Sequence, residues 1–139
     1  MELLQETVDI LGGRTVFHRR FDTPRQFDQA VRQGLPATSI TSLQHGYGIR
    51  PQAILPDSTW KRRQKAGRLS PDESDKAVRI GHVLALARHV LGDDAMVRSF
   101  LNHPHPELTG DRPVDAILSE IGAREVEAIL WRIFYGLPA

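Results

Sequence analysis

The sequence of 139 residues contains no cysteine, and this absence excludes several kinds of site at once. Without thiols there is no disulfide framework, no thiolate nucleophile, and no zinc or iron–sulfur site built on cysteine. No uncharged stretch approaches the roughly 20 residues that a membrane-spanning helix requires. The opening Met-Glu-Leu-Leu-Gln-Glu carries acid where a signal peptide carries base. We therefore expect a soluble, cytoplasmic protein with no membrane partner.

Motifs for catalysis are scarce as well. No serine stands in a nucleophile-elbow setting, and no glycine-rich phosphate loop occurs. His103-Pro104-His105-Pro106 suggests a metal site, but no further ligand set lies at a recognisable spacing. His82 and His89 would lie about 10 Å apart along a helix, too far to share one ion. We expect no catalytic residue, no metal and no cofactor; a metal-dependent enzyme built on His103 and His105 is the least favoured hypothesis.

The net charge is small, but charged residues are unevenly distributed along the chain. The net charge is +1, yet the segment from Arg50 to Arg68 holds six basic residues and a single acid, Asp57. The rest of the chain holds 12 basic and 16 acidic residues. A basic segment within a mildly acidic body indicates a localised contact with an anion.

Helix starts and stops are clearly marked. Thr23-Pro24-Arg25-Gln26 has the form of a capping box and predicts a helix that ends at Gly34. Ser70-Pro71-Asp72-Glu73 repeats the pattern before a longer helix that ends near Leu91. Further helices are expected from Asp93 or Asp94 to Leu101, from Pro113 to Ile121 with Gly122 as the stop, and from Ala123 to Tyr135.

Strand signals are few. Thr15-Val16-Phe17 is compatible with a short extended piece, and residues 1–22 are expected to form a flexible arm or a strand. There is no internal repeat and no low-complexity tract. The prediction for the fold class is all-α.

The basic segment has the pattern of a helix-turn-helix motif. A short helix at about 36–45 is followed by glycines, a short apolar piece at 52–55 and a break at Pro56-Asp57. A basic helix then runs over 58–66, with Trp60 as its apolar anchor. In this geometry the second helix enters the major groove of DNA. A merely solvated helix face is the alternative, but a single apolar anchor leaves most of the helix free for a partner.

The last helix has two faces. One is an ordinary core stripe that consists of Val126, Ile129, Leu130, Ile133, Phe134 and Leu137. Trp131 and Tyr135 point the other way, on the side of Arg124 and Ala128. Tyrosine, tryptophan and arginine dominate interface hot spots, so we expect an interface here. The alternatives are burial on both sides within one domain, or a homodimer.

Several blocks of sequence combine into a family pattern, among them Gly34-Leu35-Pro36, Leu55–Arg63, Leu91-Gly92-Asp93, positions between Phe100 and Ile117, Arg68–Asp75 and Gly122–Gly136. The blocks Arg68–Asp75 and Gly122–Gly136 together are specific for one family. From about Gly34 to Ala139, the chain resembles the Xre/MbcA/ParS antitoxins of toxin–antitoxin pairs whose toxins carry the RES fold.

The resemblance implies an Xre-like helix-turn-helix at 35–67 and a toxin-binding domain at 68–139. It gives no account of residues 1–33, so the N-terminal arm and short helix expected at 1–34 rest on the local sequence alone. Toxins of this group act on NAD, either by degrading it or by ADP-ribosylating a target, and the antitoxin's C-terminal helix and tail cover the NAD pocket. The implied toxin-facing residues are Arg124, Trp131, Arg132, Tyr135, Gly136, Leu137, Pro138 and Ala139. The implied DNA-facing residues are Ser58, Thr59, Lys61, Arg62, Arg63 and Lys65.

The sequence therefore favours a non-enzymatic antitoxin that sequesters a RES-domain toxin and represses its own operon as a homodimer on a two-fold operator. The alternative hypothesis is a stand-alone repressor whose C-terminal lobe only dimerises.

Overall fold

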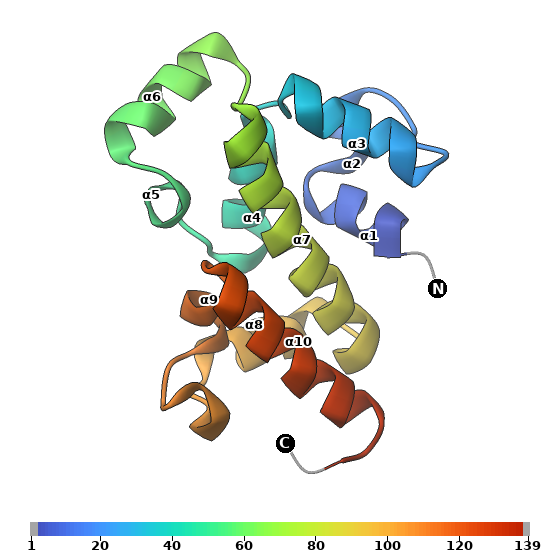
Figure 1. Cartoon of the computed structure of the whole chain (residues 1–139), viewed down its shortest axis with the longest axis vertical. Coiled ribbons are helices and arrows are strands. Elements are labelled where there is room, and N and C mark those ends of the chain that lie inside the picture. Colours follow the sequence, from blue (N-terminus) through green and yellow to red (C-terminus); the bar gives the residue numbers. More distant parts are fainter. Residues whose placement is uncertain (1–2, 138–139) are drawn as a thin grey trace. The chain divides into compact units, whose positions relative to one another are not determined.

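A computed structural model describes residues 3–137, and these form ten α-helices, one 3-10 helix and no strand (Figure 1). The all-α prediction is confirmed. The chain divides into two compact units, of which one ends at Gly81 and the other begins at His82. The division expected after residue 67 falls before the long helix α7, whereas the units divide inside it. No helix within 3–137 is long and apolar enough to cross a membrane.

The first unit is built from six helices and the start of a seventh. They are α1 (Leu3–Ile10), α2 (Gly13–Phe17), α3 (Pro24–Gln33), α4 (Thr38–Tyr47), α5 (Pro51–Ile54), α6 (Asp57–Ala66) and α7 (Pro71–Leu91). Its fully buried large side chains include Leu11, Phe21, Leu35, Ile40 and Leu43. Helix α5 contacts both α4 and α6, and α6 lies at an edge of the unit, away from α1 and α3 (Figure 1). This leaves much of the surface of α6 uncovered.

The second unit is built around the end of α7. It contains α8 (Asp94–Asn102), the 3-10 helix η1 (Pro106–Leu108), α9 (Pro113–Ala116) and α10 (Glu120–Phe134). The short helix α9 contacts both α8 and α10. The fully buried large side chains here include Leu84, Leu86, Leu101, Ile117, Ile129 and Leu130.

Three of the predicted helix starts are confirmed by hydrogen bonds. The Thr23 hydroxyl accepts from the N–H of Gln26 at 3.2 Å, and the Asp93 carboxylate accepts from the N–H of Met96 at 2.8 Å. At the start of α7, the N–H of Glu73 donates to Ser70 Oγ at 3.2 Å. The N–H of Ser70 donates in return to Glu73 Oε1 at 2.9 Å, which completes a capping box.

The expectation of an arm or a strand over residues 1–22 is wrong for the residues that the structure describes. Residues 3–10 and 13–17 are helical, and Thr15-Val16-Phe17 lies inside α2. Val8, Leu11 and Val16 are buried. Three residues with β propensity do not make a strand without a partner strand, and burial of an apolar helix face decides the conformation instead.

The expected helix from Pro113 to Ile121 with a stop at Gly122 is also wrong. Helix α9 ends at Ala116, and α10 already begins at Glu120, with Ser119 as its N-cap. The Ser119 hydroxyl accepts from the N–H of Gly122 at 3.0 Å, so Gly122 lies in the first turn of α10. A Cβ at this position would lie 2.0 Å from the carbonyl oxygen of Ala116. The glycine is needed for this close approach and does not end a helix.

Replacing this glycine tests the close approach. Gly122→Ala should destabilise the protein by about 1–3 kcal/mol, because the turn after α9 must shift to accommodate a methyl group. Gly46→Ala in α4 is the matched control, since a Cβ there meets no atom within 4 Å. It should stabilise the protein by about 0.5–1 kcal/mol. Urea unfolding measures both variants, and a neutral or stabilising Gly122→Ala would contradict the assignment.

Candidate functional site

The first candidate surface is the uncovered side of α6. Trp60 is its one buried apolar side chain, with 6% of its surface exposed, as the sequence predicts. Of the predicted DNA-facing residues, four are exposed and two are half-buried. The exposed ones are Ser58, Lys61, Arg62 and Lys65, and the half-buried ones are Thr59 and Arg63.

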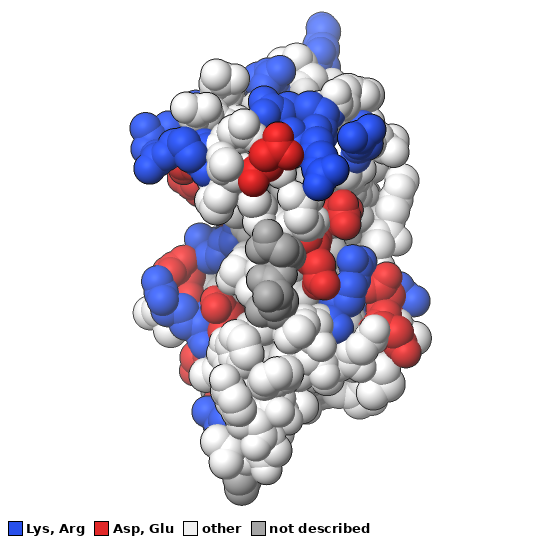
Figure 2. All heavy atoms as spheres, turned by 90° about the vertical axis from the view of Figure 1, so that its right-hand side faces the viewer, with Lys and Arg blue, Asp and Glu red and all other residues white. Residues whose placement is uncertain are grey.

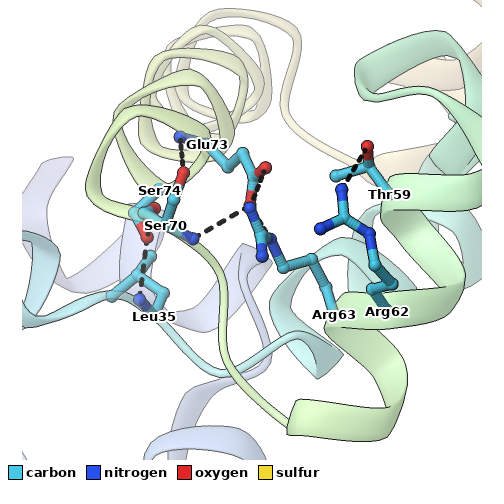
Figure 3. A network of polar contacts seen from close by, with 7 residues as sticks. All are labelled: Leu35, Thr59, Arg62, Arg63, Ser70, Glu73 and Ser74. Carbon is cyan, nitrogen blue, oxygen red and sulfur yellow. Dashed lines mark hydrogen bonds and ion pairs between the residues drawn. The ribbon is translucent and has the colours of Figure 1, made fainter.

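Arg63 is engaged within the chain. Its Nε donates to Glu73 Oε1 at 2.7 Å and its Nη2 to Glu73 Oε2 at 3.0 Å, a two-pronged ion pair (Figure 3). The two side chains are only 27% and 18% exposed. This pair joins α6 to the capping box of α7, so the structure gives Arg63 a role in holding α6 in place. The sequence does not reveal this pairing, because a salt bridge between residues 63 and 73 has no characteristic local spacing.

The same network reaches a third segment of the chain. Ser74 Oγ accepts from the backbone N–H of Leu35 at 2.8 Å and donates to the carbonyl of Ser70 at 2.8 Å (Figure 3).

The Arg63 guanidinium, followed by the backbone and hydroxyl of Ser70, lowers the pKa of the Glu73 carboxyl despite its partial burial. Glu73 in turn raises the pKa of Arg63. Glu73 is therefore held as a carboxylate at neutral pH.

The other cations of α6 have weaker contacts. Lys61 Nζ lies 3.3 Å from the Asp57 carboxylate, with side chains 74% and 53% exposed. Arg62 donates to the Thr59 hydroxyl at 3.3 Å (Figure 3). Exposed contacts of this kind contribute little to stability, so an external anion can compete for both side chains.

The second candidate surface is the end of α10. The predicted core stripe is confirmed for Val126, Ile129 and Leu130, which are buried. It is wrong for the remaining three residues: Ile133, Phe134 and Leu137 are 37%, 46% and 55% exposed. The apolar spacing continues beyond the point at which the helix is covered.

The exposed end of α10 carries an aromatic cluster, which consists of Trp131, Phe134 and Tyr135. Trp131 and Tyr135 stack with ring centroids 6.0 Å apart, and Phe134 meets their edges at 5.6 and 5.1 Å. The His89 ring lies 5.5 Å from that of Phe134. Figure 2 shows that the face in view ends, at the bottom, in a region without Lys, Arg, Asp or Glu. The two faces expected from the sequence meet in one cluster at this end of the helix.

The other predicted toxin-facing residues flank the cluster or follow it. Arg124 pairs with Glu120 at 2.8 Å, and Arg132 forms an ion pair with Glu107 of η1. Gly136 and Leu137 are exposed beyond the end of α10. Pro138 and Ala139 lie outside the described residues.

The histidines of the proline-flanked loop have local partners. His103 Nδ1 lies 2.6 Å from the carbonyl oxygen of Ser99, and His105 Nδ1 accepts from the N–H of Glu107 at 3.1 Å. Both line an apolar groove of about 340 Å³ with Leu91, Met96, Ser99, Phe100 and Pro104. Across residues 3–137, no three His, Asp or Glu side chains are arranged to hold a metal ion. His105 caps η1, the helix that carries the ion-pair partner of Arg132.

Comparison with known proteins matches most of the chain. Residues 26–81 match the antitoxin Xre-like helix-turn-helix domain, and residues 86–136 match the antitoxin Xre/MbcA/ParS C-terminal toxin-binding domain. The chain belongs to the Xre/MbcA/ParS antitoxins. It is also similar to Antitoxin Xre of Pseudomonas putida (strain KT2440), with 28% identity over 110 residues that cover 76% of this chain and 69% of the relative.

Membership of the antitoxin family confirms the resemblance seen in the sequence. Helix α6 lies within the matched helix-turn-helix domain, and the aromatic cluster lies within the matched toxin-binding domain. Residues 3–25 precede both matched regions.

The ion pair that holds α6 predicts a pH dependence of stability. The folded-state pKa of Glu73 lies below its ordinary value of 4.5, so its stabilisation is complete above that value. It is lost as the pH falls through the lower, folded-state pKa. Glu73→Gln should therefore lower the melting temperature by a few degrees at pH 7, and the difference from the parent chain should shrink as the pH falls below 4.5 and through the lowered pKa of Glu73.

Glu125→Gln is the control for this prediction, because it removes an exposed carboxylate from the other unit. Thermal unfolding followed by circular dichroism across the pH range measures both variants. A Glu73→Gln difference that persists unchanged in acid would contradict an ionic origin.

Proposed function

We propose that this chain neutralises a cognate toxin by binding it with the aromatic cluster and the tail that follows. The observation that carries the proposal is the exposure of Phe134 and Tyr135, which pack on the half-buried Trp131, within a match to a toxin-binding domain. Aromatic side chains at a helix end supply large contact areas, and rings that already pack on one another lose little freedom on binding.

The proposed partner is a RES-domain toxin that consumes NAD, and the proposed mechanism is occlusion of its NAD pocket. Covering a pocket requires no catalysis by the antitoxin, only an interface on the order of 1,600 Å² with a few anchoring residues. In this proposal the aromatic cluster inserts into the NAD pocket of the toxin. Arg124 and Arg132 lie at the rim of the interface, and residues 136–139 extend the covered area. Arg132 enters the interface already oriented by its ion pair with Glu107.

We further propose that α6 binds operator DNA and that a homodimer on a two-fold operator represses the operon, in the cytoplasm. Lys61, Arg62 and Lys65 are exposed and supply the positive charge, and Ser58 and Thr59 lie at the start of the same helix. Amino-terminal residues of a recognition helix are those that reach base edges. Arg63 contributes by fixing the helix through Glu73.

A second candidate function uses the same surfaces differently. In a stand-alone repressor, the second unit would serve only to dimerise the chain. The exposed aromatic cluster and the apolar groove beside His103 and His105 favour this candidate, because self-association also buries apolar surface.

Changing two ring-stacking residues separates the two candidates. Trp131→Ala with Tyr135→Ala should weaken capture of the toxin encoded by the neighbouring reading frame by at least 100-fold, as expected for two hot-spot residues at roughly 2 kcal/mol each. Ile121→Ala is the control, since Ile121 is exposed at the opposite end of α10. Size-exclusion chromatography with light scattering measures both the homodimer and the complex with the toxin. Loss of the homodimer with unchanged toxin binding would contradict the antitoxin proposal.

Neutralising two cations tests DNA binding by α6. Lys61→Gln with Arg62→Gln should flatten the dependence of log K on log salt by about 1.8, which corresponds to two phosphate contacts at 0.9 each. Fluorescence anisotropy with the chain's own upstream DNA measures the slope. An unchanged slope would place the DNA contact elsewhere.

A further inference from the structure

The segment that precedes α4 carries a second concentration of arginine. Residues 14–32 contain five arginines and two aspartates. Figure 2 shows Lys and Arg side chains gathered over the upper part of the face in view, where α3 lies. The basic character of the first unit therefore extends well beyond α6.

Only some of these arginines form ion pairs with acidic side chains. Arg25 and Arg32 share the Asp28 carboxylate at 3.4 and 3.0 Å, and Arg20 lies 3.6 Å from Asp22. Arg14 and Arg19 are exposed and have no acidic partner within residues 3–137. The uncompensated charge thus lies on the residues that connect α2 to α3 and on α2 itself.

The backbone that carries Arg19 and Arg20 is firmly held. Phe21 is 1% exposed and meets the rings of Phe17 and Phe27 edge-on at 5.4 and 5.1 Å. The Gln5 side-chain amide donates to the carbonyl of Phe21 at 2.8 Å. The Arg19 guanidinium lies 4.5 Å from the centroid of the Phe21 ring, a cation–π arrangement. An anion that binds here meets cations that are already in position.

Two neighbouring recesses give this surface its shape. Arg14, Arg19 and Arg20 line one of about 270 Å³, in which Asp9 is the single lining carboxylate. Arg19 also lines the other, of about 160 Å³, together with Arg68. Arg68 follows the C-cap of α6 and donates to the carbonyl of Gly34 at 2.6 Å. A row of cations therefore continues from the end of α6 through Arg68 to Arg19.

We propose that Arg14, Arg19 and Arg20 bind backbone phosphates of DNA beside the site that α6 reads. Guanidinium groups match the geometry of phosphate oxygens, and such contacts position a protein on the duplex without reading sequence. The inference rests on the proposed DNA binding by α6 and enlarges the footprint expected from the helix-turn-helix alone.

The test removes the two uncompensated charges. Arg14→Gln with Arg19→Gln should flatten the salt slope by about 1.8 on both the upstream duplex and a scrambled duplex of equal composition. The ratio of the two affinities should stay unchanged, since phosphate contacts carry no sequence information. Arg98→Gln with Arg112→Gln is the matched control, because it removes the same charge from the second unit, and it should leave the slope unchanged.

The outcomes separate this inference from the function on which it rests. Parent protein that shows no salt-dependent binding to either duplex overturns both. A slope that falls for the Lys61 and Arg62 variant but not for the Arg14 and Arg19 variant overturns this inference alone. Weakened toxin capture by the latter, with unchanged DNA binding, overturns it in favour of a protein partner.

A charge-preserving variant guards against an effect of misfolding. Arg14→Lys with Arg19→Lys should retain the salt slope of the parent chain, because each lysine still neutralises one phosphate. A slope as flat as that of the glutamine variant would overturn the phosphate contact.

Discussion

The position of α6 depends on one carboxylate. Glu73 accepts hydrogen bonds from the backbone of Ser70 and from two nitrogens of Arg63, while its neighbour Ser74 binds the backbone of Leu35 (Figure 3). Helix α6 has a single buried apolar anchor, Trp60, which is little for a helix of ten residues. Because apolar burial alone holds so small a part of α6, the polar junction at the start of α7 sets how the helix is presented.

This junction also gives the cations of α6 two different roles, one structural and one in binding a partner. The charge of Arg63 is neutralised inside the chain, and its desolvation is offset by two hydrogen bonds to a carboxylate. Lys61, Arg62 and Lys65 remain exposed. One arginine of the basic run therefore maintains the architecture, and its neighbours are left for a partner. A run of basic residues in a sequence does not show which of them pair within the chain and which are available to a partner.

Local signals were readable from the sequence, and long-range ones were not. The caps at Thr23 and Ser70 are predictable, and that of α8 is narrowed to Asp93 or Asp94, because each is a hydrogen bond between residues three positions apart. Gly122 was misread because a glycine that ends a helix and one that admits a neighbouring carbonyl look alike in sequence. The helices over residues 3–17 were missed because their apolar spacing is short and is stabilised by tertiary burial.

The same distinction applies to the candidate sites. The helical spacing of residues 126–137 identified an apolar stripe, but spacing cannot say where covering elements end, so the exposure of Ile133 and Phe134 was not foreseen. The aromatic character of Trp131 and Tyr135 was predictable, since it depends on residue type alone. The pairing of Arg63 with Glu73 was not, because it depends on how two helices meet.

The placement of the aromatic cluster on α10 has a consequence for the order of events during translation. The ribosome releases residues 57–74, with every side chain of the Glu73 junction, before it completes residues 131–135. Because domains generally fold in the order in which they emerge, α6 is set in place while the cluster is still unmade. A nascent chain therefore acquires the basic surface of α6 before the aromatic cluster of α10. A ribosome that stalls between the two segments leaves a product that has the basic surface of α6 but lacks the aromatic cluster.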